Sequence, residues 1–430
     1  MENLATVGLA VVGLCALTLI VLLMAAMPRA SFVLWAITLF FVPVWIGVTV
    51  GFFWAALTIV TLLAIVANAR SIRLHPVDAL MGAFLLLVVA QYALGYTPIS
   101  AAVTAALEWV LPYAWGRLLF ARVTPAFTTV CLSVLAVLAA AFAIVEFMSR
   151  ANFFLTLPPL GPSFEVWGTL QVRAGMFRAE GAWGHAIALG GGLAMSAGFI
   201  LLAPWRMTLR ILALAIVGTA IVMTFSRIGL VTFVLTIALS IVCLPQIGRA
   251  TRVAVAFAGI VGAAVVVPVI SGVFLEAGQE AGGSADYRGD LFALFRQVRL
   301  FGTAPSTAGV TAGGEYLGMF ARSIDNAVLL IGLRVGWIGL ILLAAAVAVV
   351  IVTALRRGSN PASIAVASQV PGLFAVALIT QYGMYFWFLA GLGIAWSMIP
   401  RESEQLAAPF AVPASRARGS AARPARRPLA

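Results

Sequence analysis

The sequence is poor in charge, in histidine and in cysteine. Only 9% of its 430 residues are charged, and it has two histidines and three cysteines, whereas 63% of the residues are hydrophobic. A soluble globular domain has about a quarter of its residues charged and about half apolar, so this composition excludes an ordinary soluble fold. It predicts an all-α, polytopic membrane protein.

Lysine is absent: all 26 basic residues are arginine, and the net charge is +12. The arginines gather in short loops and near the C-terminus, as in membrane proteins, so we do not expect nucleic acid as a partner. Cys15, Cys131 and Cys243 lie in apolar stretches without zinc or CxxC spacing and are predicted to be core residues. The chain has no P-loop, no GxGxxG, no metal-spaced His/Cys cluster and no DxD pair, so we expect no cofactor and no metal.

The apolar stretches predict 11 to 13 transmembrane helices, because about 20 apolar residues are needed to cross the hydrocarbon core. The first stretch has no basic segment before it and no clear cleavage site, so we expect a retained helix. The run 31–69 is too long for one helix, and Pro43 and Gly47 to Gly51 indicate a turn within it. The expected spans are 5–27, 31–47, 51–69, 76–95, 99–120, 126–148, 182–203, 208–225, 228–246, 253–274, 327–354, 364–381 and 384–399.

Short-loop arginines predict the orientation, because they favour the cytoplasmic side. Alternating spans put six clusters on one side, namely Arg70/Arg73, Arg117/Arg122, Arg206/Arg210, Arg249/Arg252, Arg356/Arg357 and the tail from Arg401. The predicted regions are N-terminal helices 1–148, central helices with a first outer loop 149–274, a large outer loop 275–326, C-terminal helices 327–400 and a disordered basic cytoplasmic tail 401–430.

Polar residues from four separate stretches are predicted to meet at the outer face, where charges near the membrane often form a site. The stretch "RAEGAWGHAIALGGG" carries Arg178, Glu180 and His185, and "TFSRIGL" carries Arg227 in a short turn. A third stretch, in the large outer loop, carries Arg288, Arg296 and Arg299, and the fourth, at the end of that loop, carries Arg322 and Asp325. Arg173 lies at the end of the first outer loop.

Simpler structural interpretations stay open for these residues. Arg227 would snorkel to lipid headgroups, His185 would be a packing histidine, and Glu180 would favour a helix start. Gly190 to Gly192 would permit close helix packing, and several loop arginines would simply be solvated. The segment 291–300 fits a short amphipathic surface helix or an ordinary packed loop helix.

Arginines at an outer pocket point to phosphate chemistry. Guanidinium groups pair bidentately with phosphate or pyrophosphate, so a lipid-linked pyrophosphate would suit such a pocket. The arginines would neutralise the leaving pyrophosphate while one base takes the proton of an acceptor hydroxyl. His185 and Asp325 are the two candidates for that base.

Four stretches resemble, in the same order, motifs of the O-antigen ligase and polymerase superfamily of bacterial polysaccharide assembly. They are "RAEGAWGHAIALG", "TFSRIGL", "YRGDLFALFRQVRLFGTAP" and "SIDNAVLLIGLRVGWIGL", and the resemblance covers roughly 173–345. It implies a GT-C-like membrane fold and a metal-independent, inverting glycosyltransferase that moves an undecaprenyl-pyrophosphate-linked glycan to an acceptor sugar hydroxyl. Its partners would be the acceptor glycan or lipid, membrane lipids, a flippase and a chain-length regulator.

By this resemblance, Arg178, Arg227 and Arg288 would bind the pyrophosphate and His185 would line the site. Secondary contacts are assigned to Arg173, Arg296, Arg299, Arg322 and Arg334. The chain departs from the family at Ala186, where the family often has proline, and in the turn "GTAPSTAG". It also has Asp325-Asn326 where ligases have a histidine, which favours a polymerase of capsule or exopolysaccharide over lipid A-core ligation.

Two other classes of function remain open. A transporter or flippase for lipid-linked oligosaccharide would use Glu108 and Arg334, which lie within predicted spans and could alternatively pair with each other. A non-catalytic envelope scaffold would need none of the arginines. The predicted location is the bacterial cytoplasmic membrane, with the site on the outer face and the C-terminus in the cytoplasm.

Overall fold

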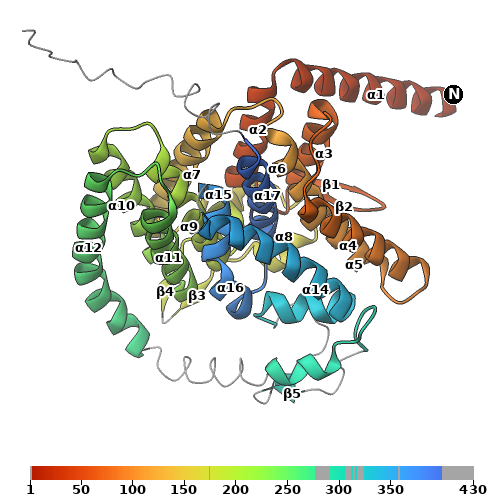
Figure 1. Ribbon diagram of the computed structural model, residues 1–430. Helices are drawn as coiled ribbons and strands as arrows, with labels where there is room; N and C mark the ends of the chain where they lie inside the picture. Colours follow the sequence, from red (N-terminus) through yellow and green to blue (C-terminus); the bar gives the residue numbers. More distant parts are fainter. Residues whose placement is uncertain are drawn as a thin grey trace, which may run out of the picture.

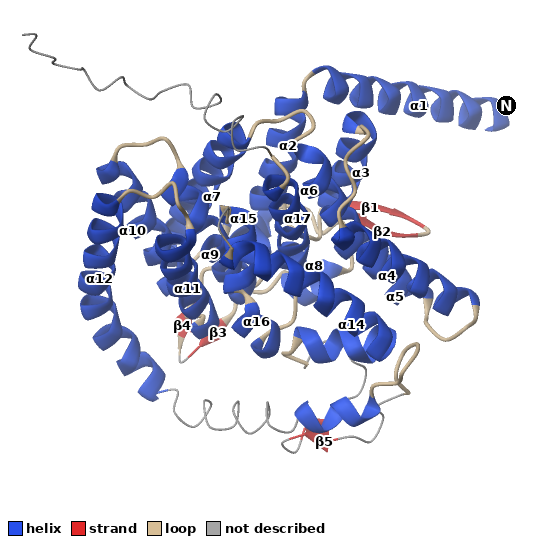
Figure 2. Cartoon of the chain, viewed as in Figure 1, coloured by secondary structure: helices blue, strands red, loops and turns tan. Residues whose placement is uncertain are grey.

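The computed structural model describes residues 2–173, 175–276, 291–305, 311–312, 315–316, 324–356 and 359–399. The predicted site residues Arg288 and Arg322 and the predicted tail 401–430 lie outside these ranges. The described chain is mostly helical, in agreement with the all-α prediction, and Figure 2 shows that its few strands form short hairpins between helices.

The helices pack into one body from which α1 projects, while α12 lies along the opposite side (Figure 1). The helices are α1 Glu2–Ala26, α2 Pro28–Phe41, α3 Ala56–Asn68, α4 Pro76–Ala93, α5 Ile99–Thr104, α6 Leu111–Leu119, α7 Pro125–Ser149, α8 Ser163–Trp167, α9 Ala186–Leu202, α10 Met207–Met223, α11 Arg227–Cys243, α12 Arg249–Glu276, α14 Ala327–Leu355, α15 Pro361–Ser368, α16 Val370–Ala375 and α17 Thr380–Ser397. The antiparallel hairpins pair β1 Gly47–Val50 with β2 Phe52–Ala55, β3 Val172–Arg173 with β4 Met176–Phe177, and β5 Thr311–Ala312 with β6 Glu315–Tyr316. A π-helical turn, Ala105–Val110, joins α5 to α6.

Three of the described helices are long and apolar enough to cross a membrane, namely α4, α7 and α14. The C-terminal part of α1, Gly13–Ala26, and the helix α2 are bent by 112° at the break between them, and counting the two as one span gives a fourth. Five further apolar segments are shorter. The predicted total of 11 to 13 spans therefore remains a prediction.

Three of the predicted spans, 31–47, 51–69 and 364–381, have clearly different ends in the structure. The turn expected within 31–69 is present, but it is a β-hairpin, with Gly51 at φ +71°, so α2 ends at Phe41 and α3 starts at Ala56. The span predicted over 364–381 divides into α15, α16 and a non-helical stretch 376–379. Pro371 explains the division, because it has no N–H to donate to the carbonyl four residues earlier.

Arginine clusters that were predicted to share one side lie at the same end of the bundle. The Arg117 guanidinium donates to the Arg73 carbonyl at 2.8 Å and to Met398 Sδ at 3.6 Å, so the ends of α6 and α17 meet the loop before α4. Arg117 also forms a buried salt bridge with Asp78, with 2.7 Å between Nε and Oδ1. These contacts place Arg73 and Arg117 at one end of the bundle, and the predicted orientation in the membrane stays a prediction.

The helix α14 is broken at Gly336, where the sequence predicted a continuous span. Gly336 has φ +76° and ψ 176°, a conformation open essentially only to glycine. The segment 299–304 packs against the break: the N–H groups of Trp337 and Ile338 donate to the carbonyls of Arg299 and Leu300, at 2.8 and 3.2 Å.

The carbonyls released on the other side of the break also find partners. Those of Leu333, Arg334 and Val335 accept from Ala304 N, Thr303 Oγ1 and Gln91 Nε2, at 2.7, 2.8 and 3.0 Å respectively. Since an unsatisfied backbone group in an apolar medium costs several kcal/mol, these bonds make the break a stable part of the fold.

Candidate functional site

The loop that enters α9 is clamped between the ends of two helices. The Glu146 carboxylate, at the end of α7, accepts from the backbone N–H groups of Glu180 and Gly181 at 3.1 and 2.8 Å. On the other side, the Ala179 N–H donates to the carbonyl of Met223, the last residue of α10, at 3.1 Å. Residues 179–181 are therefore held by α7 and α10 together.

The predicted residues Arg178 and Arg227 meet at the turn between α10 and α11. Arg178 Nε donates to the Thr224 carbonyl at 2.8 Å, and its Nη1 donates to Gln171 Oε1 at 3.2 Å. Arg227 is the first residue of α11 and is exposed, directly after Ser226, whose hydroxyl caps the helix by accepting from Gly229 N–H at 3.1 Å. The turn thus places two arginines from separate stretches at one helix end.

Glu180 does not begin the helix α9, so the expected helix-start role was wrong. Its side chain is fully buried, and Oε1 accepts from the Gln171 N–H at 2.7 Å. Its Oε2 is buried without a hydrogen-bond partner among the described residues. Burial, helped by the charge of Glu146, raises the pKa of Glu180 to about 8, against the opposing effects of the Gln171 N–H and Arg178.

His185 has the role that had been expected of Glu180. It is the N-cap of α9, and its Nδ1 accepts from the Ile187 N–H at 3.1 Å. Burial, with the neighbouring charge of Arg178, lowers the pKa of His185 to about 3. The imidazole is therefore neutral near pH 7 and carries its proton on Nε2.

The three glycines that follow allow neighbouring groups to touch the α9 backbone, as expected. A Cβ on Gly190 would lie 3.2 Å from Thr224 Oγ1, and one on Gly191 would lie 2.6 Å from the Tyr382 ring. A Cβ on Gly192 would collide with the Trp183 ring. Close packing at Gly190 brings α9 directly against the turn that carries the two arginines.

The other predicted residues are more scattered. Asp325 is exposed and directly precedes Asn326, the N-cap of α14, while Arg296 and Arg299 are exposed in the segment 291–305. Arg173 lies in β3, on the hairpin next to Arg178. The segment 291–300, expected to form a short amphipathic surface helix or a packed loop helix, is helical over 291–297. Its Leu291 and Leu294 are buried in one cluster with Leu329 of α14, as in a packed loop helix.

Two contacts connect Asp325 to the arginine turn through α16. The Ala327 N–H donates to the Val376 carbonyl, at the end of α16, with 3.1 Å between N and O. A Cβ on Gly372, within α16, would lie 3.7 Å from Ile228, the residue after Arg227. The start of α14 and the start of α11 therefore lie at the same end of the bundle.

Arg334 stands apart from this end, beside the break in α14. Its charge interacts with that of Glu108, which is exposed on the π-helical turn, yet the two are not within 4 Å of each other. Within the described ranges, no hydrogen bond of the Arg334 side chain is found. Of the alternatives left open for Arg334, a direct ion pair with Glu108 is not formed, although the two charges interact.

Several residues that organise the site escaped sequence reasoning. Glu146 and Gln171 carry no motif, and Thr224 holds Arg178 through its backbone carbonyl. Gln381 bridges the carbonyls of Val42 and Ala182, which fixes the loop from the opposite side. The one available signal was Glu146 itself, a lone acid at the end of a long apolar stretch.

Comparison with known proteins does not assign a family. No family model, no curated protein and no solved structure matches the chain. Among the described residues, no three His, Cys, Asp or Glu side chains lie together in a group able to hold a metal ion.

Proposed function

We propose that this protein is a polytopic membrane glycosyltransferase, similar to O-antigen ligases and polysaccharide polymerases. It would transfer an undecaprenyl-pyrophosphate-linked glycan to an acceptor sugar hydroxyl on the outer face of the bacterial cytoplasmic membrane. The observation that carries the proposal is the placement of Arg178 and Arg227 at one turn, next to the capped start of α9.

The geometry suits binding of a pyrophosphate. Two of the groups that hold Arg178, the Thr224 carbonyl and the Gln171 amide oxygen, are neutral, and they orient the guanidinium. The Nε2–H of His185 would add one hydrogen bond to a phosphate oxygen. Together with Arg227, these groups would stabilise the negative charge that develops on the leaving pyrophosphate.

The assignment of the base follows from the state of His185. A group whose pKa is about 3 and whose Nδ1 already accepts a hydrogen bond is a poor proton acceptor at neutral pH. Asp325, exposed at the same end of the bundle, is the better candidate to take the proton from the acceptor hydroxyl.

A transfer assay tests the proposal. Purified protein in nanodiscs is given a lipid-linked oligosaccharide, and chain lengthening is followed by gel or mass spectrometry. We expect Arg178→Ala and Arg227→Ala to reduce the rate by about a hundredfold or more, as for loss of a charge-stabilising group. The matched control, Arg206→Ala, removes an exposed arginine at the other end of α10 and leaves the rate unchanged. Equal rates for all three variants would refute the proposal.

A flippase is the second candidate, favoured by the broken helix α14. Broken helices with intramembrane charges are typical of transporters, and Arg334 and Glu108 lie beside such a break. Chain lengthening in nanodiscs, where no second compartment exists, would exclude transport as the main activity.

A further inference from the structure

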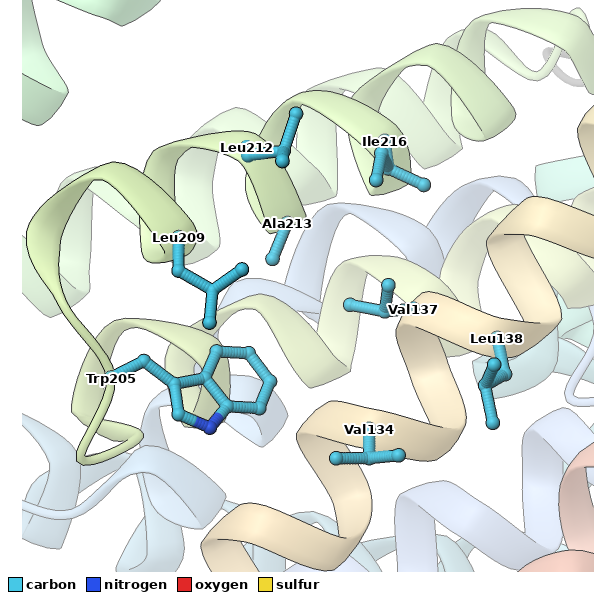
Figure 3. Close-up of a pocket in the computed structure, with 8 residues that line it drawn as sticks. All are labelled: Val134, Val137, Leu138, Trp205, Leu209, Leu212, Ala213 and Ile216. Atoms are coloured by element: carbon cyan, nitrogen blue, oxygen red, sulfur yellow. The ribbon is translucent and has the colours of Figure 1, made fainter.

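An apolar groove runs along the outside of α7 and α10 (Figure 3). Its volume is about 180 Å³. One wall is formed by Val134, Val137 and Leu138 of α7, and the other by Leu209, Ala213 and Ile216 of α10. No charged side chain lines it, and Trp205 closes one end.

The groove lies on the same two helices that hold the arginine turn. At the C-terminal ends of these helices, the rings of Phe147 and Phe225 are in contact, with 6.0 Å between their centroids. Leu138 and Ile216 each stand nine residues earlier, about 14 Å along a helix. The two helices therefore run side by side in the same direction, and the groove begins about 14 Å below the level of Arg227.

Exposed apolar side chains continue along α7 from the groove toward the C-terminal end of the helix. Leu138 is 47% exposed, and Val145 and Met148, further along α7, are 63% and 71% exposed. Val145 and Met148 follow Leu138 by seven and ten residues and so lie near one side of the helix. Glu146, the one charged residue of α7, is buried, so the exposed side chains between the groove and this helix end are apolar.

We propose that the groove holds the polyprenyl chain of the lipid-linked pyrophosphate whose head binds at Arg178 and Arg227. The inference rests on the proposed function and adds the site of the lipid tail. Charge complementarity selects the occupant: the apolar side chains lead toward the helix end that lies by the two arginines, as required by a single chain with a pyrophosphate at one end. The methyl-branched isoprenoid also fits walls of branched Val, Leu and Ile side chains, where the small Ala213 leaves room.

Prenyl pyrophosphates of increasing length test the assignment. Protein in nanodiscs is titrated with inorganic pyrophosphate and with geranyl, farnesyl and geranylgeranyl pyrophosphate, and binding is measured by displacement of radiolabelled geranylgeranyl pyrophosphate. In the wild type, affinity should rise with chain length once the chain reaches the groove.

Filling the groove should remove that gain. We expect Ile216→Trp to weaken geranylgeranyl pyrophosphate binding about tenfold, the effect of overpacking a contact, and to leave inorganic pyrophosphate binding unchanged. Leu138→Trp fills the groove from the other wall and should act in the same way. Val234→Trp, at a 65% exposed position on α11 that does not line the groove, is the matched control for lipid partitioning and should bind like the wild type.

The outcomes separate the groove from the proposed function. If both groove variants bind geranylgeranyl pyrophosphate like the wild type, the groove belongs to another lipid and the inference is overturned, while the arginine site stands. If Arg227→Ala and the wild type bind inorganic pyrophosphate equally weakly, the proposed function itself fails.

A photoreactive farnesyl pyrophosphate gives a second measurement that needs no groove variant. Labelling should fall on peptides of α7 and α10 and be competed by geranylgeranyl pyrophosphate. Labelling confined to other helices would overturn the assignment.

Discussion

Replacing Glu180 by glutamine should make the protein more stable at alkaline pH. The pKa of Glu180 is raised from 4.5 to about 8, because the side chain is buried and lies near Glu146. A group whose pKa is higher in the folded state contributes stability in full below its unfolded pKa. That contribution is lost as the pH rises from 4.5 to about 8.

The magnitude follows from the same values. A tenfold change in an ionisation equilibrium is worth about 1.4 kcal/mol, so ionising Glu180 in the folded protein costs at most about 5 kcal/mol more than in the unfolded chain. Glutamine cannot ionise, and its amide oxygen can still accept from the Gln171 N–H. We therefore expect Glu180→Gln and the wild type to be similar near about pH 5 and the variant to be more stable by about 2–5 kcal/mol near about pH 9.

Tryptophan fluorescence during thermal unfolding in detergent measures the difference. The midpoint of the wild type should fall between acid and alkaline pH, and that of Glu180→Gln should fall less. Glu165→Gln, at an exposed position in the same loop, is the control and should follow the wild type. Parallel pH profiles of the wild type and Glu180→Gln would refute the reasoning.

Two further predictions concern the broken helix and the cap of α9. Gly336→Ala should destabilise the protein by about 1–3 kcal/mol, because the new Cβ would lie 2.9 Å from the carbonyl oxygens of Arg299 and Leu300; an unchanged unfolding midpoint would contradict this. His185→Ala should cost about 1 kcal/mol through loss of the cap, whereas His185→Asn, which can still accept from the Ile187 N–H, should restore that stability. If the two His185 variants unfold alike, the side chain is not acting as a cap.

The placement of the candidate site residues was predictable because it depends on the length and order of the apolar stretches. Apolar stretches set the helix ends, and the ends set which arginines share a face, so Arg178, His185 and Arg227 could be placed together before any contact was known. The glycines after His185 were also predictable, because α9 packs tightly at those positions.

The loop itself was not predictable, because main-chain groups make its decisive contacts. The carbonyls of Thr224 and Met223 carry no side-chain signal, and Glu146 contacts residues more than 30 positions away. His185, and not Glu180, caps α9 for the same reason. Sequence position suggests that the acid stabilises the helix start, but only the path of the chain shows which side chain reaches the first N–H groups.

The burial of Glu180 bears directly on the proposed chemistry. An ionised carboxylate at this position would attract the Arg178 guanidinium and compete with an incoming pyrophosphate. With its pKa near 8, Glu180 is mostly protonated at neutral pH, so it holds the Gln171 N–H without adding a negative charge beside the arginine. Gln171 then accepts from Arg178 in turn. A buried, neutral acid can therefore help to orient the cation, through Gln171, without placing a second charge beside it.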